Sequence, residues 1–378
     1  MDINELRKEI DALDDKILAL YMQRMELCAD IAEYKAKNEK SVSDFSRENA
    51  ILFRLAKTVP AEMQVYVKEL YGAIFATSKA YQSSLINRNS PTVKEIKDVL
   101  MEGSVEFPVV ASAACQGVEG SNAERAARKI FQVGDVSYFR DFASVFNAVD
   151  KGFCEYGILP VENSTSGSVL EVYDLMKKYD FRIVRSLKLR IDHCLACVKG
   201  SDIKKIEKVI SHPQALRQCG KFIAERSLQT ISAENTATAA RDLSESGDQT
   251  TAVICSADCA EKYGLVVLDR AIQDHKDNYT RFICIAKKLQ IFRGSEKISL
   301  VTSLPHEAGS LSKILSEFSA HNLNLTKIES RPISSDFEFL FYFDFEGDVT
   351  SKSVQNLIAR LELGSDKFKF LGCYKEIV

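Results

Sequence analysis

The chain has 378 residues, of which 46% are hydrophobic and 27% charged, a composition typical of a globular protein with two or three domains. Its 50 Lys and Arg residues nearly balance its 53 Asp and Glu residues. This balance argues against a nucleic-acid-binding surface and against polybasic attachment to a membrane. The charged N-terminus lacks a secretory signal, and no apolar run is long enough to span a bilayer. We therefore expect a cytoplasmic protein whose ten cysteines are reduced.

One cysteine pair, Cys194 and Cys197, forms a CxxC pattern beside His193 and could mark a zinc or redox site. A lone CxxC is a weak signal for metal binding. Apolar Leu195 and Val198 surround the pair. We therefore expect a buried strand there and no metal site.

Residues 1–88 are expected to be entirely helical. Apolar residues of the first helix recur at spacings of four and three: Leu6, Ile10, Leu13, Ile17, Leu20, Leu27, Ile31 and Tyr34. Arg24 occupies one position of this seam, and Lys35 follows three turns later on the same face. A buried guanidinium is costly without a partner. An anionic ligand would satisfy both cations; alternatively, Arg24 extends to solvent or pairs with a carboxylate.

Two more helical seams carry polar residues among apolar ones. The first contains Asp44, Glu48, Ile51 and Leu55, with Arg47 beside it, and the second contains Val67, Leu70, Ile74, Ser78 and Gln82. A helical core lined by such residues indicates a site for a small polyanion.

The first helix is too long for a compact monomeric bundle, since about 34 residues extend roughly 50 Å. It is expected to reach across a dimer. Arg7 precedes Arg24 by about 25 Å along the helix axis, so Arg7 would serve the site of the partner chain.

Residues 1–88 resemble the all-helical chorismate mutases, which form intertwined dimers. The resemblance rests on eight polar positions: Arg7, Arg24, Lys35, Asp44, Arg47, Glu48, Ser78 and Gln82. It implies the rearrangement of chorismate to prephenate, which needs no nucleophile and no proton transfer. Catalysis of such a reaction comes from holding a reactive conformer and stabilising charge on the ether oxygen.

The resemblance also implies a role for each of these residues. Arg24, Arg47 and Arg7 of the partner subunit would grip the two carboxylates. Lys35 and Gln82 would donate to the ether oxygen, and Glu48, with Asp44 nearby, would take the substrate hydroxyl. Because Gln82 is neutral, this site need not require acidic pH.

Residues 89–105 are expected to be a linker, and residues 106–288 an α/β domain with strands at 109–111, 156–159, 209–210, 252–254 and 282–285. Polar clusters adjoin four of these strands, and open α/β sheets bind ligands at the carboxyl ends of their strands. The clusters contain Gly117 and Gly120; Glu162, Asn163 and Ser164; Ser211, His212, Pro213 and Gln218; and Thr280, Arg281 and Phe282.

These clusters, with Glu234 and Thr236, resemble prephenate dehydratase, a fold of two α/β lobes related to periplasmic binding proteins with the site in the cleft. One difference concerns the first loop. The family has a small residue, an aromatic residue and Ser after the second glycine, whereas this chain has Ser121, Asn122 and Ala123. Asn122 puts the hydroxyl contribution of that loop in question.

The implied reaction couples decarboxylation of prephenate to loss of its ring hydroxyl, which gives phenylpyruvate. Thr280 would assist the departing hydroxyl within a network of Asn163, Ser164, Ser211 and Gln218, with Glu162 also binding substrate. Arg281 either holds a carboxylate or buttresses the cleft. No metal, thiamine or pyridoxal cofactor is implied, since prephenate carries its own electron sink.

Residues 297–378 are expected to form a βαββαβ, ferredoxin-like unit. Its strands are predicted at 298–303, 325–330, 337–345 and 367–374, and its helices at 310–320 and 351–361. The segment from Pro305 to Leu311 and the segment from Glu329 to Pro332 resemble the paired motifs of the ACT domain. That resemblance implies a phenylalanine site at a dimer interface, formed by Gly309, Ser310, Leu311, Glu329, Ser330 and Arg331, and feedback inhibition through it.

Together, these resemblances imply a multidomain bifunctional enzyme of phenylalanine biosynthesis in the shikimate pathway, assembled as a homodimer or larger oligomer. An amino-acid sensor without activity is one alternative, against which the presence of Lys35 and Thr280 argues. A dehydratase acting on arogenate is another alternative, which the sequence does not separate from the first prediction. The absence of GxGxxG disfavours a dehydrogenase.

Overall fold

The computed structural model describes residues 2–38, 44–86, 90–103, 105–304, 306, 309–332 and 339–378. The chain divides into two compact units, each built from two separate segments. Unit 1 comprises Met1–Asp98 and Leu300–Phe370, and unit 2 comprises Val99–Ser299 and Leu371–Val378. Among the described residues, no helix is both long enough and apolar enough to cross a bilayer.

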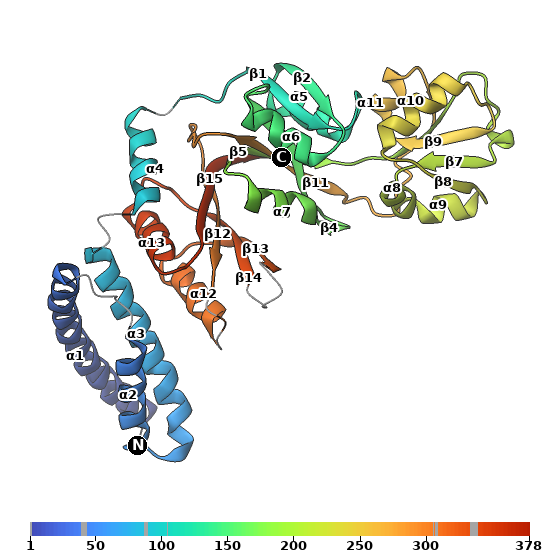
Figure 1. Ribbon diagram of the computed structural model, residues 1–378. Helices are drawn as coiled ribbons and strands as arrows, with labels where there is room; N and C mark the ends of the chain where they lie inside the picture. Colours follow the sequence, from blue (N-terminus) through green and yellow to red (C-terminus); the bar gives the residue numbers. More distant parts are fainter. Residues whose placement is uncertain are drawn as a thin grey trace. The chain divides into compact units, whose positions relative to one another are not determined.

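The N-terminal part of unit 1 is helical, as predicted. It contains α1 (Ile3–Lys37), α2 (Phe45–Ala56), a short 3-10 helix (Ala61–Met63) and α3 (Gln64–Ile86) (Figure 1). A capping box of Asp2 and Glu5 starts α1, which then continues without a break over 35 residues. α1 packs along α3, and Cys28, Ala32 and Phe75 are buried there.

The apolar seam of α1 is exposed in the single chain, which differs from the expected buried face. Leu13, Ile17 and Leu20 are 55%, 61% and 65% exposed. The residues that α1 turns toward α3 lie one position away from the seam, at Cys28 and Ala32. The periodicity therefore identified an apolar face correctly, but no described part of the same chain covers it.

The segment predicted as a linker contains a helix, α4 (Pro91–Met101). Pro91 suits the first helical position because it has no N–H to satisfy there. The Glu362 carboxylate accepts from the Thr92 backbone N–H at 3.3 Å and so caps the helix, and it also accepts from the Thr92 hydroxyl at 2.6 Å and from the Ser90 hydroxyl. The predicted linker residues 89 and 104 lie outside the described part of the chain.

The C-terminal part has the predicted βαββαβ order: β12 (Lys297–Ser303), α12 (Ser310–Ala320), β13 (Leu325–Pro332), β14 (Phe339–Glu346), α13 (Lys352–Leu363) and β15 (Phe368–Ile377). Its sheet order is β13-β14-β12-β15. Phe318, Phe343 and Phe345 form a buried aromatic cluster. β12 and β15 each contribute residues to both units. Residues 337 and 338 of the predicted third strand lie outside the described residues.

Unit 2 contains two sheets with separate cores, as expected for two lobes. The first lobe contains β1 (Val110–Gln116), β2 (Val133–Phe139), β3 (Tyr156–Asn163), β4 (Gly167–Ser168), β5 (Arg182–Arg190) and β11 (Tyr279–Ala286), with helices α5 (Asn122–Ile130), α6 (Phe142–Asp150) and α7 (Leu170–Lys178). Its strand order is β15-β5-β11-β3-β1-β2, and β11 runs antiparallel to both of its neighbours.

The second lobe contains β6 (Cys194–Cys197), β7 (Lys208–Ser211), β8 (Gln229–Ser232), β9 (Thr251–Cys255) and β10 (Val266–Arg270), in the order β10-β6-β9-β7-β8. Its helices are α8 (Pro213–Gln218), α9 (Gly220–Glu225), α10 (Thr236–Ser246) and α11 (Ala257–Lys262), and a 3-10 turn (Ile203–Lys205) precedes β7. All four residues of β6 are buried, which confirms the buried strand predicted for the cysteine pair.

Candidate active sites

Arg24 of α1 lies against α3 and is half-buried. Its Nη1 atom donates to the Ser78 hydroxyl and to Cys28 Sγ, and its guanidinium carbon lies 5.9 Å from the centre of the Phe75 ring. These contacts turn Arg24 away from the exposed apolar seam. Arg24, the charged residue among the apolar positions of the seam, therefore lies at the contact between α1 and α3.

Gln82 follows Ser78 by one helical turn and is 7% exposed. Its Oε1 atom is buried and has no hydrogen-bond partner among the described residues. Native proteins rarely leave a buried amide oxygen without a partner, so this oxygen is open to a donor from outside the chain. Ser78 and Gln82 therefore mark a polar site on α3.

α2 carries the two predicted acidic residues, Asp44 at its start and Glu48 beside α3. Asp44 is the N-cap of this helix, and its Oδ1 atom accepts from the Arg47 backbone N–H at 2.9 Å. Glu48 pairs with Lys79 Nζ at 2.9 Å. The sequence reasoning missed Lys79, although its place beside Ser78 on α3 could have indicated it. Lys79 neutralises the charge of Glu48.

The remaining predicted cations of the helical domain are Arg7, Lys35 and Arg47. The side chains of Arg7 and Arg47 are exposed and make no hydrogen bond or ion pair with the described residues. Lys35 is half-buried. Because α1 is continuous, Arg7 lies about 25 Å from Arg24 along the helix axis. Arg7 and Arg24 of the same chain therefore cannot contact the same small ligand.

The cleft residues of unit 2 meet where β3 pairs with β11. Thr280 is opposite Asn163, and Arg281 is opposite Glu162. Asn163 Nδ2 donates to Thr280 Oγ1 at 3.0 Å and to Asn278 Oδ1 at 2.8 Å. The register thus places two predicted residues in direct contact.

Hydrogen bonds from Gln218 join the two lobes. Gln218 ends α8 in the second lobe, and its Nε2 atom donates to Thr165 Oγ1 at 2.7 Å. The same Thr165 hydroxyl donates to Asn163 Oδ1 at 2.7 Å. The result is a network of side chains from β3, α8 and β11. Sequence reasoning missed Thr165 and Asn278, although each is close to a predicted residue in the chain.

His193 adds a titratable group to this network. Its Nε2 atom lies 3.0 Å from Gln218 Oε1, which also accepts from Asn278 Nδ2 at 3.2 Å. Burial lowers the pKa of His193 below its ordinary value. Since an amide oxygen only accepts, the neutral imidazole carries its proton on Nε2. Sequence reasoning considered His193 only as a neighbour of the cysteine pair.

The hydroxyls of Ser164 and Ser211 are bonded to backbone groups. Ser164 Oγ donates to the Asp277 carbonyl at 2.9 Å and accepts from the Tyr279 N–H at 2.9 Å. Ser211 is fully buried, and its hydroxyl donates to the Ile254 carbonyl at 2.6 Å. Ser164 connects β3 to the segment before β11. Ser211 connects β7 to β9.

Arg281 is 7% exposed and directs its guanidinium toward β15. Its Nε atom lies 2.9 Å from Glu376 Oε2, and its Nη2 atom donates to the Tyr374 hydroxyl at 2.7 Å. This geometry supports the buttressing alternative over the holding of a carboxylate. Glu162, opposite Arg281 on β3, is half-buried.

The first loop of unit 2 is a tight turn that leads into α5. Gly117 and Gly120 have φ values of 104° and 85°, which side-chain-bearing residues rarely adopt. The Gly120 N–H donates to the Glu124 carboxylate, and Ser121 caps the helix. Asn122 Oδ1 accepts from Arg125 at 3.0 Å. Asn122 therefore bonds along its own helix.

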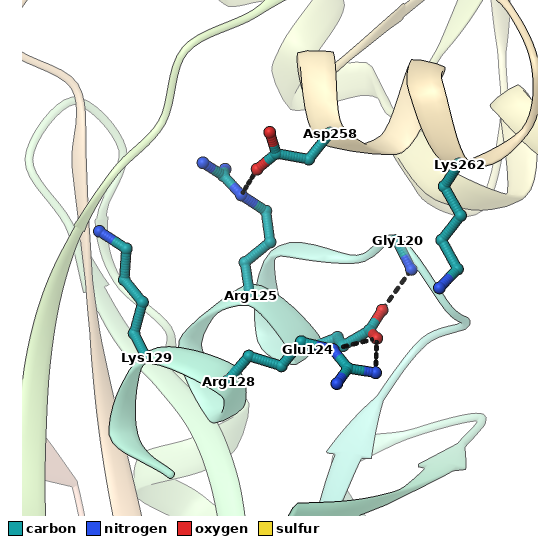
Figure 2. Close-up of a pocket in the computed structure, with 7 residues that line it drawn as sticks. All are labelled: Gly120, Glu124, Arg125, Arg128, Lys129, Asp258 and Lys262. Carbon is teal, nitrogen blue, oxygen red and sulfur yellow. Dashed lines mark hydrogen bonds and ion pairs between the residues drawn. The ribbon is translucent and has the colours of Figure 1, made fainter. Parts of the chain in front are cut away.

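A pocket of about 330 Å³ lies between α5 and α11, beside this loop (Figure 2). Its lining is rich in cations: Gly120, Glu124, Arg125, Arg128, Lys129, Asp258 and Lys262. Ion pairs join Arg125 to Asp258 at 2.9 Å and Arg128 to Glu124 at 2.7 Å. The lining includes neither Asn163 nor Thr280, so the pocket is separate from the hydrogen-bonded network of the cleft.

In unit 1, the predicted effector residues lie at the start of α12 and on β13. Gly309 has a φ of 87°, and the hydroxyl of Ser310 is buried with no hydrogen-bond partner among the described residues. Glu329 and Arg331 alternate along β13 with exposed Ser330. Leu311 is half-buried. Pro305, Glu307 and Ala308 of the predicted motif lie outside the described residues.

Two family models match this chain. One is chorismate mutase type II, over residues 6–83, and the other is prephenate dehydratase, over residues 113–290. The first match covers the helices that carry Arg24, Ser78 and Gln82. The second covers the network of Asn163, Gln218 and Thr280.

The similar proteins described here cover between 68% and 98% of the chain. The bifunctional chorismate mutase/prephenate dehydratase of Escherichia coli K12 is 31% identical, over 98% of this chain and 95% of its own. Arogenate dehydratase/prephenate dehydratase 1 of Arabidopsis thaliana is 36% identical, over 68% of this chain and 70% of its own. The crystal structure of an Arthrobacter aurescens prephenate dehydratase in complex with L-Phe is 28% identical and superposes with a TM-score of 0.64, covering 70% of this chain and 89% of that chain.

Proposed function

This chain belongs to the family of bifunctional chorismate mutase/prephenate dehydratases, and from that premise we propose which residues carry each of its two reactions. The enzyme rearranges chorismate to prephenate and converts prephenate to phenylpyruvate, in the biosynthesis of phenylalanine. The helical part of unit 1 performs the first reaction. The two lobes of unit 2 perform the second.

For the mutase reaction, Arg24 and Arg47, with Arg7 of the partner subunit, bind the two carboxylates of chorismate. Lys35 and Gln82 donate to the breaking ether oxygen, which develops negative charge in the transition state. Glu48 and Asp44 receive the substrate hydroxyl, and Ser78 holds Arg24 in place. The burial of Gln82, one helical turn after Ser78 on α3, supports its place beside the substrate.

We propose that the mutase site is completed in a homodimer formed through α1. The support is the exposed apolar seam of this helix, with Leu13, Ile17 and Leu20 all more than half exposed. A long exposed apolar stripe marks a surface for interaction with another protein. A second copy, antiparallel on the first, would bring its Arg7 toward Arg24 of the first chain.

For the dehydratase reaction, the network of Asn163, Gln218 and Thr280 is the observation that carries the proposal. Thr280 Oγ1 accepts a hydrogen bond from Asn163 Nδ2, so its own proton stays available for donation. It donates this proton to the departing ring hydroxyl, which leaves as water, and solvent returns a proton to Thr280. The carboxylate leaves as CO₂, and the electron pair of the broken C–C bond completes the aromatic ring.

The other predicted cleft residues support this network. Gln218 and Asn163 are joined through Thr165, and they hold the two lobes together around the substrate. Glu162 binds substrate beside this network. The side chains of Ser164, Ser211 and Arg281 stabilise the strands around it through the contacts described above. The substrate is prephenate; activity on arogenate, which the name of the Arabidopsis relative includes, is the second candidate.

We propose further that phenylalanine binds at the ACT-like part of unit 1 and inhibits the enzyme. The buried Ser310 hydroxyl without a partner lies at the N-terminus of α12, where backbone N–H groups are available to a carboxylate. Glu329 and Arg331 lie on the neighbouring motif. The L-Phe complex of the Arthrobacter dehydratase supports this effector.

Incubation of the purified protein with chorismate alone tests the whole proposal. Mass spectrometry should show chorismate consumed, prephenate formed and then lost, and phenylpyruvate accumulated, with less phenylpyruvate when phenylalanine is present. Arogenate is offered in a parallel reaction. Accumulation of prephenate without phenylpyruvate would contradict the roles assigned to Asn163, Gln218 and Thr280.

A further inference from the structure

A buried ionic cluster lies directly behind the dehydratase residue Thr280, and the reaction described above leaves it without a role. Its centre is the Glu376 carboxylate on β15, which lies 2.9 Å from Arg281 Nε, 2.8 Å from Lys297 Nζ and 3.0 Å from Lys188 Nζ. The Ser186 hydroxyl donates to the same carboxylate at 3.0 Å. Three cations and a hydroxyl thus converge on one anion.

A second contact ties Arg281 to the same strand. Its Nη2 atom donates to the Tyr374 hydroxyl at 2.7 Å, and the Ser299 hydroxyl lies 2.5 Å from that oxygen. Tyr374 and Ser299 are almost completely buried. Glu376 and Tyr374 are two residues apart on β15, so they present their side chains on the same face of the strand. The planar guanidinium therefore has two fixed partners on β15.

This anchoring acts on the strand that carries Thr280. Arg281 is the next residue on β11, and the pairing of β11 with β3 shifts register between Arg281 and Phe282. Such bulges loosen the ladder locally and change the direction of neighbouring side chains. β5 lies between β11 and β15, so the Arg281 side chain reaches across one strand to β15.

We propose that Glu376 and Tyr374 are positioning residues of the dehydratase reaction: they fix Arg281 and thereby hold Thr280 against Asn163. This inference rests on the proposed role of Thr280. Loss of either contact would leave the bulged end of β11 free to shift. A shift of this kind weakens the alignment of Thr280 with the leaving hydroxyl more than it weakens substrate binding.

The test compares Glu376→Gln and Tyr374→Phe with Lys375→Gln, a substitution at the exposed residue between them. With prephenate as substrate, Glu376→Gln should lower kcat about ten-fold or more and change KM less than about two-fold. Tyr374→Phe, which removes one hydroxyl and keeps the ring, should lower kcat about three-fold. Lys375→Gln should leave both parameters unchanged. Denaturant unfolding of unit 2 in each preparation shows that the dehydratase lobes remain folded.

Thr280→Ala supplies the background that separates this inference from the function it rests on. If Glu376 acts through Thr280, Glu376→Gln should cause little further loss in the Thr280→Ala enzyme. An unchanged kcat in both β15 variants, or a rise in KM alone, would overturn the positioning role. Full dehydratase activity of Thr280→Ala itself would instead contradict the proposed function.

Discussion

The mutase and dehydratase sites present their polar residues in opposite states. On the helices, Arg7 and Arg47 are exposed, and the Oε1 atom of Gln82 has no partner among the described residues. In the cleft, both amide atoms of Asn163 are bonded, and Gln218 bonds across the two lobes. The polar side chains of the dehydratase site are thus already bonded to one another within one chain, whereas those of the mutase site are not, in keeping with the proposal that a second copy completes the mutase site.

Mixing two inactive variants would test this contrast most strongly. Arg7→Ala and Arg24→Ala should each lower mutase turnover on the order of a hundred-fold or more, because each removes a charged contact to a carboxylate. In a mixed dimer one site carries both changes and the other carries neither. Equal mixing after unfolding and refolding should therefore restore roughly a quarter of the activity.

Dehydratase activity is the control, since it should stay at full strength in both variants and in the mixture. Mutase activity that does not recover on mixing would contradict a site shared between two chains.

Gly372→Ala should damage the dehydratase unit alone. Gly372 has a φ of 147°, and a Cβ atom there would lie 2.2 Å from the Ile183 carbonyl oxygen. Relieving this contact would move β15 away from β5, at a cost of about 3–5 kcal/mol in the free energy of unfolding. We expect unit 2 to unfold at a much lower denaturant concentration while mutase activity remains.

Gly72→Ala is the matched control for this change, because α3 leaves open space around Gly72. Alanine in a helix interior should be neutral or stabilise the protein by up to about 1 kcal/mol. Equal damage from both substitutions would show that the clash at Ile183 is not the cause.

The stability of unit 2 should depend on pH through His193. Because the folded pKa of His193 lies below its ordinary value of 6.5, the unfolded chain binds the proton more readily. The stability of unit 2 is therefore complete above that ordinary value and falls as the pH drops through it toward the folded pKa. Unfolding of the protein and of His193→Asn, measured between pH 5 and pH 8, should show a shallower loss on the acidic side in the variant.

The smallest effect is expected from the ion pair between Arg125 and Asp258. It joins α5 of one lobe to α11 of the other, at the pocket in Figure 2, and Asp258 is 71% exposed. Exposed pairs of this kind contribute about 0–1 kcal/mol. Arg125→Gln and Asp258→Asn should therefore each lower the free energy of unfolding by a similar small amount. The loss relative to the unchanged protein should shrink in high salt. A large loss from only one of them would indicate another role for that residue.

The sequence predicted much of this molecule because local patterns decide much of it. The repeat of Leu13, Ile17 and Leu20 predicted one long helix with an apolar face, and alternating apolar runs predicted the strands of unit 2. The same periodicity does not say which surface covers a face. For that reason the seam of α1 was expected to be buried and is exposed in the single chain.

Contacts between distant segments were the least predictable features. Lys79, Thr165 and Asn278 each lie close to a predicted residue in sequence, yet their roles follow from strand register and helix packing. The pairing of Arg281 with Glu376 joins residues far apart in the chain, and no spacing rule reveals it. Helix α4 was missed because its polar residues resemble a linker, whereas Glu362 caps it from a distant helix.

The route of the chain through its two units limits how the enzyme can be divided. Residues 371–378 belong to unit 2, although the 71 residues before them belong to unit 1. The ACT-like domain was predicted over 297–378, and a truncation based on that boundary would also remove the last residues of β15. Such a shortened enzyme would lack Glu376. The resulting fall in dehydratase activity would be wrongly attributed to removal of the regulatory domain. Deletion experiments on this enzyme should therefore join residue 299 to residue 371 through a short linker.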